Sequence, residues 1–277
     1  MLDNINFGKR IALLRKDKGY TQEQLAQILN VTGQAVSKWE KGNALPDTGL
    51  LPFLAKALNV SIDSLFTGEG IVLIDGPYDE EYEKPDFYWG LEHSDLAEKI
   101  IKVMKDELKS NKTLLDIGSG EGRDAIYFAE NGFAVDALEI SLPGIEKIKK
   151  FSSAKGLSIN TIHADMIGYK LTNNYDVIYS MGSLQFLPIE QRHQHFKMYK
   201  KSTNSSGYNA HLVFVDKPFI PTAPDWKPNE FYYKSGELAS YYYDWEIVYF
   251  EEMIIDCSSA NLPHKHAVNS IIAKKIC

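Results

Sequence analysis

The first 66 residues alternate short apolar stretches with polar breaks. Phe7, Ile11 and Leu14 recur at helical spacing, and Gly19 ends this first segment. The same pattern predicts further helices over residues 21–29, 34–41, 49–58 and 62–66. Because these segments are short and closely spaced, residues 1–68 are expected to form an all-α domain.

From residue 96 onward, helical and extended patterns alternate. Helices are expected over residues 96–108, 122–129, 142–155, 189–201 and 236–242. Strands are expected over residues 113–117, 134–139, 159–163, 175–180, 210–215, 246–250 and 267–274. This alternation predicts an α/β doubly wound (Rossmann-like) domain over residues 96–277, with a mostly parallel sheet.

Residues 69–95 have a composition of their own. Between residues 75 and 95, eight acidic residues accompany a single basic residue, Lys84. The same stretch holds five aromatic residues: Tyr78, Tyr82, Phe87, Tyr88 and Trp89. Two interpretations stay open, an acidic linker and a segment that folds over its neighbour as a lid.

The charge is distributed unevenly along the chain. The net charge of the 277 residues is -7, which argues against a protein that coats nucleic acid by bulk charge. Residues 1–45, however, carry 7 basic and 4 acidic residues, a net charge of +3. The N-terminal end can therefore meet phosphates, whereas the acidic remainder would not do so readily.

The two cysteines, Cys257 and Cys277, form neither a CxxC pair nor a zinc-ligand spacing. Neither a metal site nor a disulfide framework is therefore predicted. The N-terminus carries charges where a signal peptide needs an apolar core, and the chain has no run of 18 apolar residues. These features predict a soluble, cytoplasmic protein without a membrane partner.

Two of the expected short helices flank a tight break at residues 31–33, as in a helix-turn-helix. The run TQEQLAQILNVTGQAVSKWEKGNALPD, with the small Ala26 at the helix contact, resembles the lambda-repressor/Cro-like helix-turn-helix family over about residues 5–66. The resemblance implies sequence-specific binding of double-stranded DNA. A charge of +3 predicts modest affinity for a monomer, so a homodimer on two half-sites, the family's usual assembly, is expected.

The resemblance also implies roles for single residues in DNA binding. Gln34 and Lys38 lie one turn apart on the exposed face of the second helix, where the family reads bases. The positions at which the family contacts phosphates are occupied by Gln22, Thr32, Lys41 and Asn43. Gln22 and Thr32 lie at helix N-termini, where backbone N–H groups already favour an anion.

The strand expected at 113–117 runs directly into GSGEGR at 118–123 and a helix. Such a turn lets the backbone approach a ligand closely. Arg123 stands where a nicotinamide-type GxGxxG needs glycine, and the GK[ST] of a P-loop is absent. LLDIGSGEGRD instead resembles motif I of class I S-adenosylmethionine (SAM) methyltransferases. VDALEI, HADM and YDVIYSMGSLQFL follow in the family's order, so the resemblance covers about residues 77–277.

This resemblance implies that SAM is the cofactor and S-adenosylhomocysteine the product. The glycines of the turn would frame the amino-acid part of SAM, Glu139 would accept hydrogen bonds from both ribose hydroxyls, and Asp165 would lie beside the adenine. The full set of cofactor-binding candidates is Tyr88, Trp89, Asp116, Gly118, Ser119, Gly120, Gly122, Arg123, Glu139, Ile140, Asp165, Met166, Ser180 and Met181.

YWGLEHS, GRDAIYFAENG and GELASYYYDWEIVYFEE resemble tellurite-resistance-type and related small-molecule methyltransferases. The resemblance implies a small acceptor, such as a thiol or a chalcogen oxyanion. Such an acceptor needs little general-base help, so the enzyme mostly has to position it. The acceptor-pocket candidates are Ser183, Gln185, Phe186, His264 and His266. No catalytic residue is assigned.

His264 and His266 share a face if they lie on a strand, which invites a metal or general-base role. A single pair without a nearby third ligand is a weak signal, so an ordinary surface position competes with acceptor-site function.

Two functions from different classes remain. In the first, the protein is a small-molecule methyltransferase with a DNA-binding head. In the second, it is a transcription regulator whose SAM domain is a sensor with little or no catalysis. A DNA amino-methyltransferase is disfavoured, because SMGS at 180–183 replaces the Asn/Asp-Pro-Pro-aromatic run that holds a flipped base.

Overall fold

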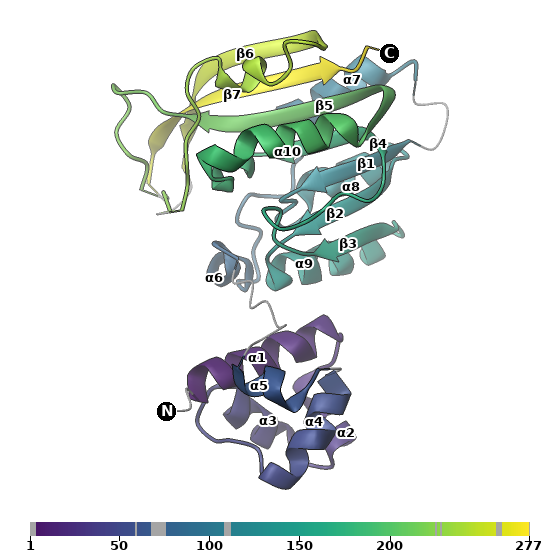
Figure 1. Ribbon diagram of the computed structural model, residues 1–277, viewed down its shortest axis with the longest axis vertical. Coiled ribbons are helices and arrows are strands. Elements are labelled where there is room, and N and C mark those ends of the chain that lie inside the picture. Colours follow the sequence, from purple (N-terminus) through teal and green to yellow (C-terminus); the bar gives the residue numbers. More distant parts are fainter. Residues whose placement is uncertain are drawn as a thin grey trace. The chain divides into compact units, whose positions relative to one another are not determined.

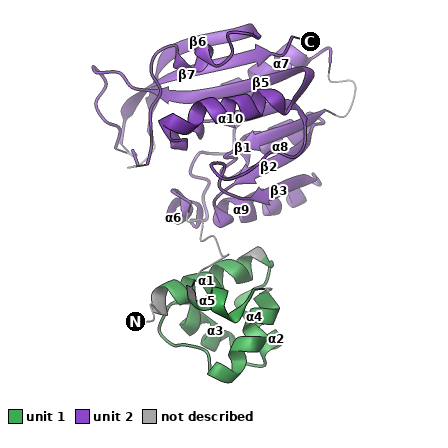
Figure 2. Ribbon diagram, in the orientation of Figure 1, with its two compact units in different colours: residues 1–75 green, residues 76–277 purple. Residues whose placement is uncertain are grey.

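The computed structural model of the protein describes residues 4–58, 60–67, 76–107, 112–224, 226–227, 229–258 and 262–276. The chain divides into two compact units, Met1–Asp75 and Gly76–Cys277 (Figure 2). Of the expected linker, residues 69–75 lie outside the described residues, and the remainder belongs to the second unit. Among the described helices, none has both the length and the apolarity that a membrane crossing requires.

The first unit is all-α, as its amphipathic pattern predicts. Its elements are α1 (Asn4–Asp17), α2 (Gln22–Leu29), α3 (Gly33–Glu40), the 3-10 helix η1 (Thr48–Leu50), α4 (Leu51–Leu58) and α5 (Ile62–Thr67). At the start of α2, Thr21 Oγ1 accepts from the backbone N–H of Gln24, whose side chain accepts in return from the N–H of Thr21. This capping box satisfies two backbone donors and fixes where α2 begins.

A glycine allows α1 to lie close to the end of α3. A Cβ atom added to Gly8 would lie 2.3 Å from the carbonyl oxygen of Trp39 and 2.7 Å from that of Glu40. Both contacts are to backbone, which cannot rotate away. The two helices share the core of this unit, in which Phe7, Ile11, Leu25, Val36 and Leu54 are fully buried.

Replacing Gly8 with alanine should therefore destabilise the first unit by about 2–3 kcal/mol, because α1 must move away from α3. The loss is measured by urea unfolding followed by circular dichroism. Gly49→Ala is the matched control, because its added methyl group meets only the Asp47 carboxylate, at 3.2 Å. Equal stability of Gly8→Ala and the control would show that the helices do not approach this closely.

The second unit contains one seven-stranded sheet in the order β3-β2-β1-β4-β5-β7-β6 (Figure 1). Its strands are β1 (Thr113–Ile117), β2 (Ala134–Glu139), β3 (Ile159–His163), β4 (Tyr175–Met181), β5 (Thr203–Val215), β6 (Glu246–Cys257) and β7 (His264–Lys274). The first five are parallel to one another, and β7 is antiparallel to both β5 and β6. The predicted mostly parallel, doubly wound sheet is confirmed.

Helices cover both faces of this sheet (Figure 1). They are α7 (Asp95–Met104), α8 (Arg123–Glu130), α9 (Leu142–Ala154), the 3-10 helix η2 (Leu184–Phe186), α10 (Ile189–Lys201) and α11 (Glu237–Ser240), while the short helix α6 (Asp79–Tyr82) lies beside α9. Side chains of α7, α8 and α9 share one buried cluster with Leu114, whereas those of α10 and α11 share another with Leu115. Successive residues of β1 thus point into opposite cores, as a strand buried on both faces requires.

The strand order marks the place in the sheet where a ligand site is expected. The chain passes from β1 to β2 on one side and returns to β4 on the other, so the strand order reverses between β1 and β4. In open α/β sheets, ligands bind outside the carboxyl ends of the strands at such a reversal. The turn at 118–123 follows β1, and residues 182–186 follow β4.

Candidate functional site

The turn after β1 is built from left-handed glycines. Gly118, Gly120 and Gly122 have φ values of 69°, 57° and 89°, which other residues adopt only with strain. A Cβ atom on Gly118 would lie 2.4 Å from that of Ser183, which follows β4. The missing side chain therefore lets the ends of β1 and β4 approach each other.

Two buried carboxyl groups, those of Asp116 and Glu139, lie near the carboxyl ends of the adjacent strands β1 and β2. The Glu139 carboxylate accepts from the backbone N–H of Gly120 at 2.6 Å and from that of Ser141 at 2.9 Å. Burial raises the pKa of Glu139 to about 7, although these backbone donors oppose the shift. Burial also raises the pKa of Asp116, and the nearby carboxylates of Asp124 and Glu139 add to that shift. Both carboxyl groups are therefore more readily protonated than in water, and hydrogen-bond donors from a ligand would favour their ionised forms.

An aromatic group from the acidic segment lies beside the glycine turn. Its rings are those of Tyr78, Tyr82, Tyr88 and Trp89, and Phe186 meets Tyr78 edge-on. The backbone N–H of Tyr88 donates to the Glu121 carboxylate at 2.7 Å, and Arg123 donates to the carbonyl of Trp89 at 3.0 Å. The indole N–H of Trp89 donates to the Tyr82 hydroxyl at 2.9 Å. These bonds join the segment to the turn and hold Tyr88 and Trp89 beside it.

Glu121 is a positioning residue that the sequence interpretation missed. Its buried carboxylate forms an ion pair of 2.5 Å with Lys147 of α9, in addition to its contact with the aromatic segment. It occupies a variable position of the glycine motif, so the motif gave no reason to choose it. The signal available in the sequence was the set of five aromatic residues, which needs an anchor if it is to fold over the site.

The other cofactor candidates are divided between the site and the core. Ser119 Oγ is buried and has no hydrogen-bond partner among the described residues, so the turn presents a polar atom that a ligand can pair. The Asp165 carboxylate accepts from the backbone N–H of Ile167 at 2.9 Å, and the Ile140 carbonyl lies 3.0 Å from Nε2 of His163. The half-buried side chain of Met181 packs against the core that contains Leu114, and that of Met166 packs against the core that contains Leu115.

Ser180 differs from the other candidates because its side chain belongs to an interior network. Its hydroxyl lies 2.8 Å from Nδ1 of His211, and Nε2 of the same ring lies 2.9 Å from the Tyr242 hydroxyl. Burial lowers the pKa of His211 to about 3, so the ring is neutral near pH 7. The hydroxyl of Ser180 is therefore occupied within the protein.

The candidates for the acceptor pocket behave differently from one another. The hydroxyl of Ser183 donates to the Ile117 carbonyl at 2.6 Å, which fixes the loop after β4. Nε2 of Gln185 donates to the Gly182 carbonyl at 2.6 Å, whereas its buried Oε1 has no hydrogen-bond partner among the described residues. Gln185 therefore offers an oxygen that can accept a hydrogen bond from a ligand, whereas the hydroxyl of Ser183 is already bonded within the protein.

His264 and His266 lie together at the start of β7, with their Nε2 atoms 2.9 Å apart. The register pairs His264 with Cys257 of β6. The sequence interpretation had found no third potential ligand for this pair, because Cys257 lies seven positions before His264 and outside the histidine motif. Their proximity depends on a strand pairing that residue spacing alone does not reveal.

In the first unit, the predicted DNA-binding side chains lie on or next to α2 and α3. The exposed candidates are Thr32, Gln34, Lys38, Lys41 and Asn43. Gln22 is half-buried and donates to Glu40 at 2.7 Å, while Arg15 pairs with the same carboxylate at 2.6 Å. The amide of Gln22 thus stabilises the helix packing in this structure.

Two known protein families match this chain, one over residues 11–65 and one over residues 78–261. Residues 78–261 match the family described as tellurite resistance protein TehB, which is more than half of the chain. The chain belongs to this family. A probable S-adenosyl-L-methionine-dependent methyltransferase TehB of Haemophilus influenzae is 29% identical over 162 residues, 58% of this chain and 53% of that protein. The chain thus spans about half the length of the curated TehB proteins it matches.

Structural comparison confirms the TehB-like fold of the second unit. The crystal structure of TehB from Haemophilus influenzae superposes with a TM-score of 0.58 at 24% identity, over 72% of this chain and 65% of that one. At this identity, the likeness establishes the fold and leaves the chemistry to the residues.

The N-terminal unit has relatives of its own. Residues 11–65 match a helix-turn-helix family. The HTH-type transcriptional regulator ImmR of Bacillus subtilis is 33% identical over 117 residues, 42% of this chain and 79% of that protein. The predicted helix-turn-helix is confirmed, so this member of the TehB family carries a regulator-type domain ahead of its α/β unit.

Proposed function

We infer that the protein is a SAM-dependent methyltransferase that acts on a small molecule and binds duplex DNA through its N-terminal unit. The observation that carries the enzymatic part is the left-handed glycine turn between the buried carboxyl groups of Asp116 and Glu139. The matched family and the relative's printed description support SAM as the cofactor. Transfer of a labelled methyl group from SAM to a panel of acceptors tests the proposal.

The residues around the turn fit SAM. The buried, unpartnered Ser119 Oγ and the glycine backbone offer polar contacts to the amino-acid end. Glu139 would accept hydrogen bonds from the ribose hydroxyls, Asp165 would lie beside the adenine, and Trp89 would help to exclude water. SAM itself supplies a methyl group bound to a positively charged sulfur.

The acceptor is proposed to be a thiol or a chalcogen oxyanion. Such a nucleophile already carries an available electron pair, so positioning contributes more than proton removal. Gln185, whose buried Oε1 has no partner among the described residues and can accept from a thiol S–H or from the O–H of a protonated oxyanion, is the candidate for holding it, and Phe186 would line the same pocket. The resemblance of residues 88–94, 122–132 and 236–252 to small-molecule methyltransferases of the tellurite-resistance type supports a small acceptor.

The affinity for SAM should rise as the pH increases through about 7. Glu139 has its pKa raised to about 7 by burial, and only its ionised form is a strong acceptor for ribose hydroxyls. Because binding favours loss of that proton, the dissociation constant should fall about tenfold from pH 6 to pH 8. Calorimetric titration with SAM measures it, and Glu139→Gln should show a flatter profile. An equal pH dependence in both proteins would contradict this role.

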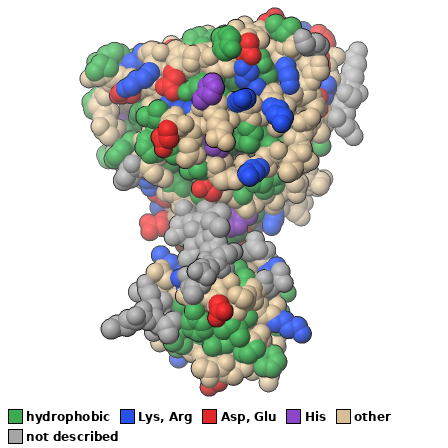
Figure 3. All heavy atoms as spheres, viewed as in Figure 1, with side chains coloured by type: hydrophobic (Ala, Val, Ile, Leu, Met, Phe, Trp, Pro, Cys, Tyr) green, Lys and Arg blue, Asp and Glu red, His purple; other side chains and the backbone are tan. Residues whose placement is uncertain are grey.

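The helix-turn-helix unit is proposed to bind DNA as a homodimer. Among its described residues, the exposed large apolar ones are Ile28, Leu45, Phe53 and Ile62. Figure 3 shows hydrophobic side chains gathered on the visible face of this unit. Exposed apolar surface of this kind is common where proteins associate, and a dimer would double the +3 charge of the region that meets DNA.

A second function, a SAM-responsive regulator with little catalysis, is favoured by the regulator-type N-terminal domain. It predicts that SAM changes the affinity for selected duplex DNA while no methylated product forms. The enzyme interpretation predicts product with or without a change in DNA affinity. Measuring product and DNA affinity in the same samples separates the two.

A further inference from the structure

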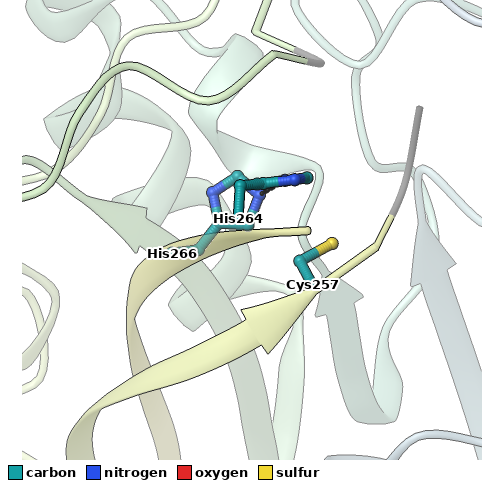
Figure 4. A group of neighbouring side chains, drawn as sticks. All are labelled: Cys257, His264 and His266. Carbon is teal, nitrogen blue, oxygen red and sulfur yellow. Dashed lines mark hydrogen bonds between the residues drawn. The ribbon is translucent and has the colours of Figure 1, made fainter. Parts of the chain in front are cut away.

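Three side chains that bind soft metal ions converge at one end of the β6–β7 hairpin (Figure 4). Cys257 ends β6, and His264 and His266 begin β7. Among the described residues, these three form a group in which one ligand atom from each lies within 4.8 Å of the others. The register pairs Cys257 with His264, and His266 follows two residues later on the same face of β7.

The spacing of the ligand atoms is close to what an ion requires. With metal–sulfur distances of about 2.3 Å and metal–nitrogen distances of about 2.0 Å, a tetrahedral ion separates its ligand atoms by about 3.3–3.6 Å. The two Nε2 atoms are 2.9 Å apart, and the full group lies within 4.8 Å. The pairing of β6 with β7 thus already brings the three ligand atoms close to the separations of a tetrahedral ion.

Contacts within the protein already orient both histidine rings for metal binding. Nδ1 of His264 lies 2.7 Å from the Leu262 carbonyl, which can only accept, so Nδ1 carries the proton and Nε2 presents its lone pair to the group. A backbone carbonyl on the second nitrogen is the usual support of a metal-bound histidine. The buried ring of His266 stacks on Phe214 at 4.5 Å and 14° between planes, which fixes its orientation.

We propose that Cys257, His264 and His266 bind a thiophilic transition-metal ion of the Zn²⁺ class through one thiolate and two Nε2 atoms. Thiolate and imidazole ligands favour such ions over Mg²⁺ or Ca²⁺, which prefer oxygen. Binding releases the thiol proton to solvent, and the proton that His266 Nε2 shares with His264 is displaced to Nδ1 or to solvent. Cys257 and His264 are partly exposed, so a fourth ligand can reach the ion from solvent.

The site lies at the same edge of the sheet as the glycine turn. Ala267 of β7 pairs with Val215 at the carboxyl end of β5, and this edge also holds the carboxyl ends of β1 and β4. The Phe214 ring bridges the two regions, because its Cζ would lie 3.8 Å from a Cβ atom placed on Gly182. The metal proposal rests on the ligand geometry alone and stands whether or not the proposed methyl transfer occurs.

Titration of the full chain with Co²⁺, after dialysis against a chelator, tests the proposal. One equivalent should bind and produce a near-ultraviolet thiolate-to-cobalt band together with the visible bands of tetrahedral cobalt, and Zn²⁺ should abolish both. Cys257→Ser should remove the thiolate band, and His264→Ala should weaken binding at least 100-fold. Circular dichroism confirms that both variants are folded.

Cys277→Ser and His193→Ala are the matched controls, since they remove the other cysteine and an exposed histidine of α10. Both should retain the cobalt spectrum and the affinity. The proposal is overturned if the folded wild-type chain binds less than one equivalent, or if the controls lose as much binding as the cluster variants.

Discussion

Replacing Glu139 with alanine is expected to weaken the binding of SAM about 100-fold. The proposed contacts are hydrogen bonds from both ribose hydroxyls to one buried carboxylate. A hydrogen bond to a charged group contributes about 1.5–3 kcal/mol, and a loss of about 2.7 kcal/mol corresponds to a factor of 100. Calorimetric titration with SAM at pH 8 measures the change with the carboxylate ionised.

Two further variants separate the ribose contact from its surroundings. Glu139→Gln keeps the volume but turns an amide donor toward the N–H of Gly120 or Ser141, so it should lose comparable affinity. Glu146→Gln makes the same chemical change at an exposed position of α9 and should bind SAM normally. Unaltered affinity in folded Glu139→Ala would refute the assigned ribose contact.

Replacing both Gln34 and Lys38 with alanine is expected to weaken specific DNA binding at least 100-fold. A well-placed base contact contributes about 1–3 kcal/mol of discrimination, and the two exposed side chains lie one helical turn apart on α3. Duplexes selected from a random library with the wild-type chain supply the target, and fluorescence anisotropy measures the affinity.

The control for this experiment is the pair Gln27→Ala and Lys56→Ala, which removes the same residue types from exposed positions on α2 and α4. The control should keep its affinity for the selected duplex, whereas Gln34→Ala and Lys38→Ala should bind selected and unrelated duplexes alike. A similar loss in both double variants would indicate general electrostatic attraction without base reading.

The sequence predicted best the helices and strands whose own residues show a clear hydrophobic period. The strand at 159–163 and the helix at 189–201 match β3 and α10 residue for residue. The strand predicted at 210–215 is instead the end of β5, which begins at Thr203. Its first residues are small and polar, so they show no strand pattern. Contacts with other parts of the chain hold these residues in the strand. Thr203 Oγ1 donates to Asn209, and Thr203 pairs with Tyr175 of β4.

The strand β6 was underestimated for a related reason. The prediction ended at Phe250, whereas the strand continues to Cys257. Glu251, Glu252 and Asp256 interrupt the apolar pattern there. Such charges are compatible with an edge strand, and Glu252 finds partners in Lys217 and Asn269. The short helix α6 was also missed, because four residues are too few to show a period.

The candidate site was predictable where a contiguous motif carries it. Asp116, the glycine turn and Glu139 each end or follow a strand, and adjacent parallel strands bring such residues together. Glu121 was missed because its role depends on Tyr88, which is distant in sequence, and Cys257 was missed because its approach to His264 depends on the pairing of β6 with β7. The core position of the Ser180 hydroxyl depends in the same way on His211.

The central claim is that the α/β unit transfers a methyl group from SAM to a small acceptor. The most direct measurement incubates the full chain with methyl-labelled SAM and separate thiol, chalcogen oxyanion, amine and phenol acceptors, with duplex DNA in parallel. The account predicts labelled low-molecular-weight product from a thiol or chalcogen acceptor, greatly reduced in Glu139→Ala. Tight SAM binding without product from any acceptor, or label found in the DNA, would contradict it.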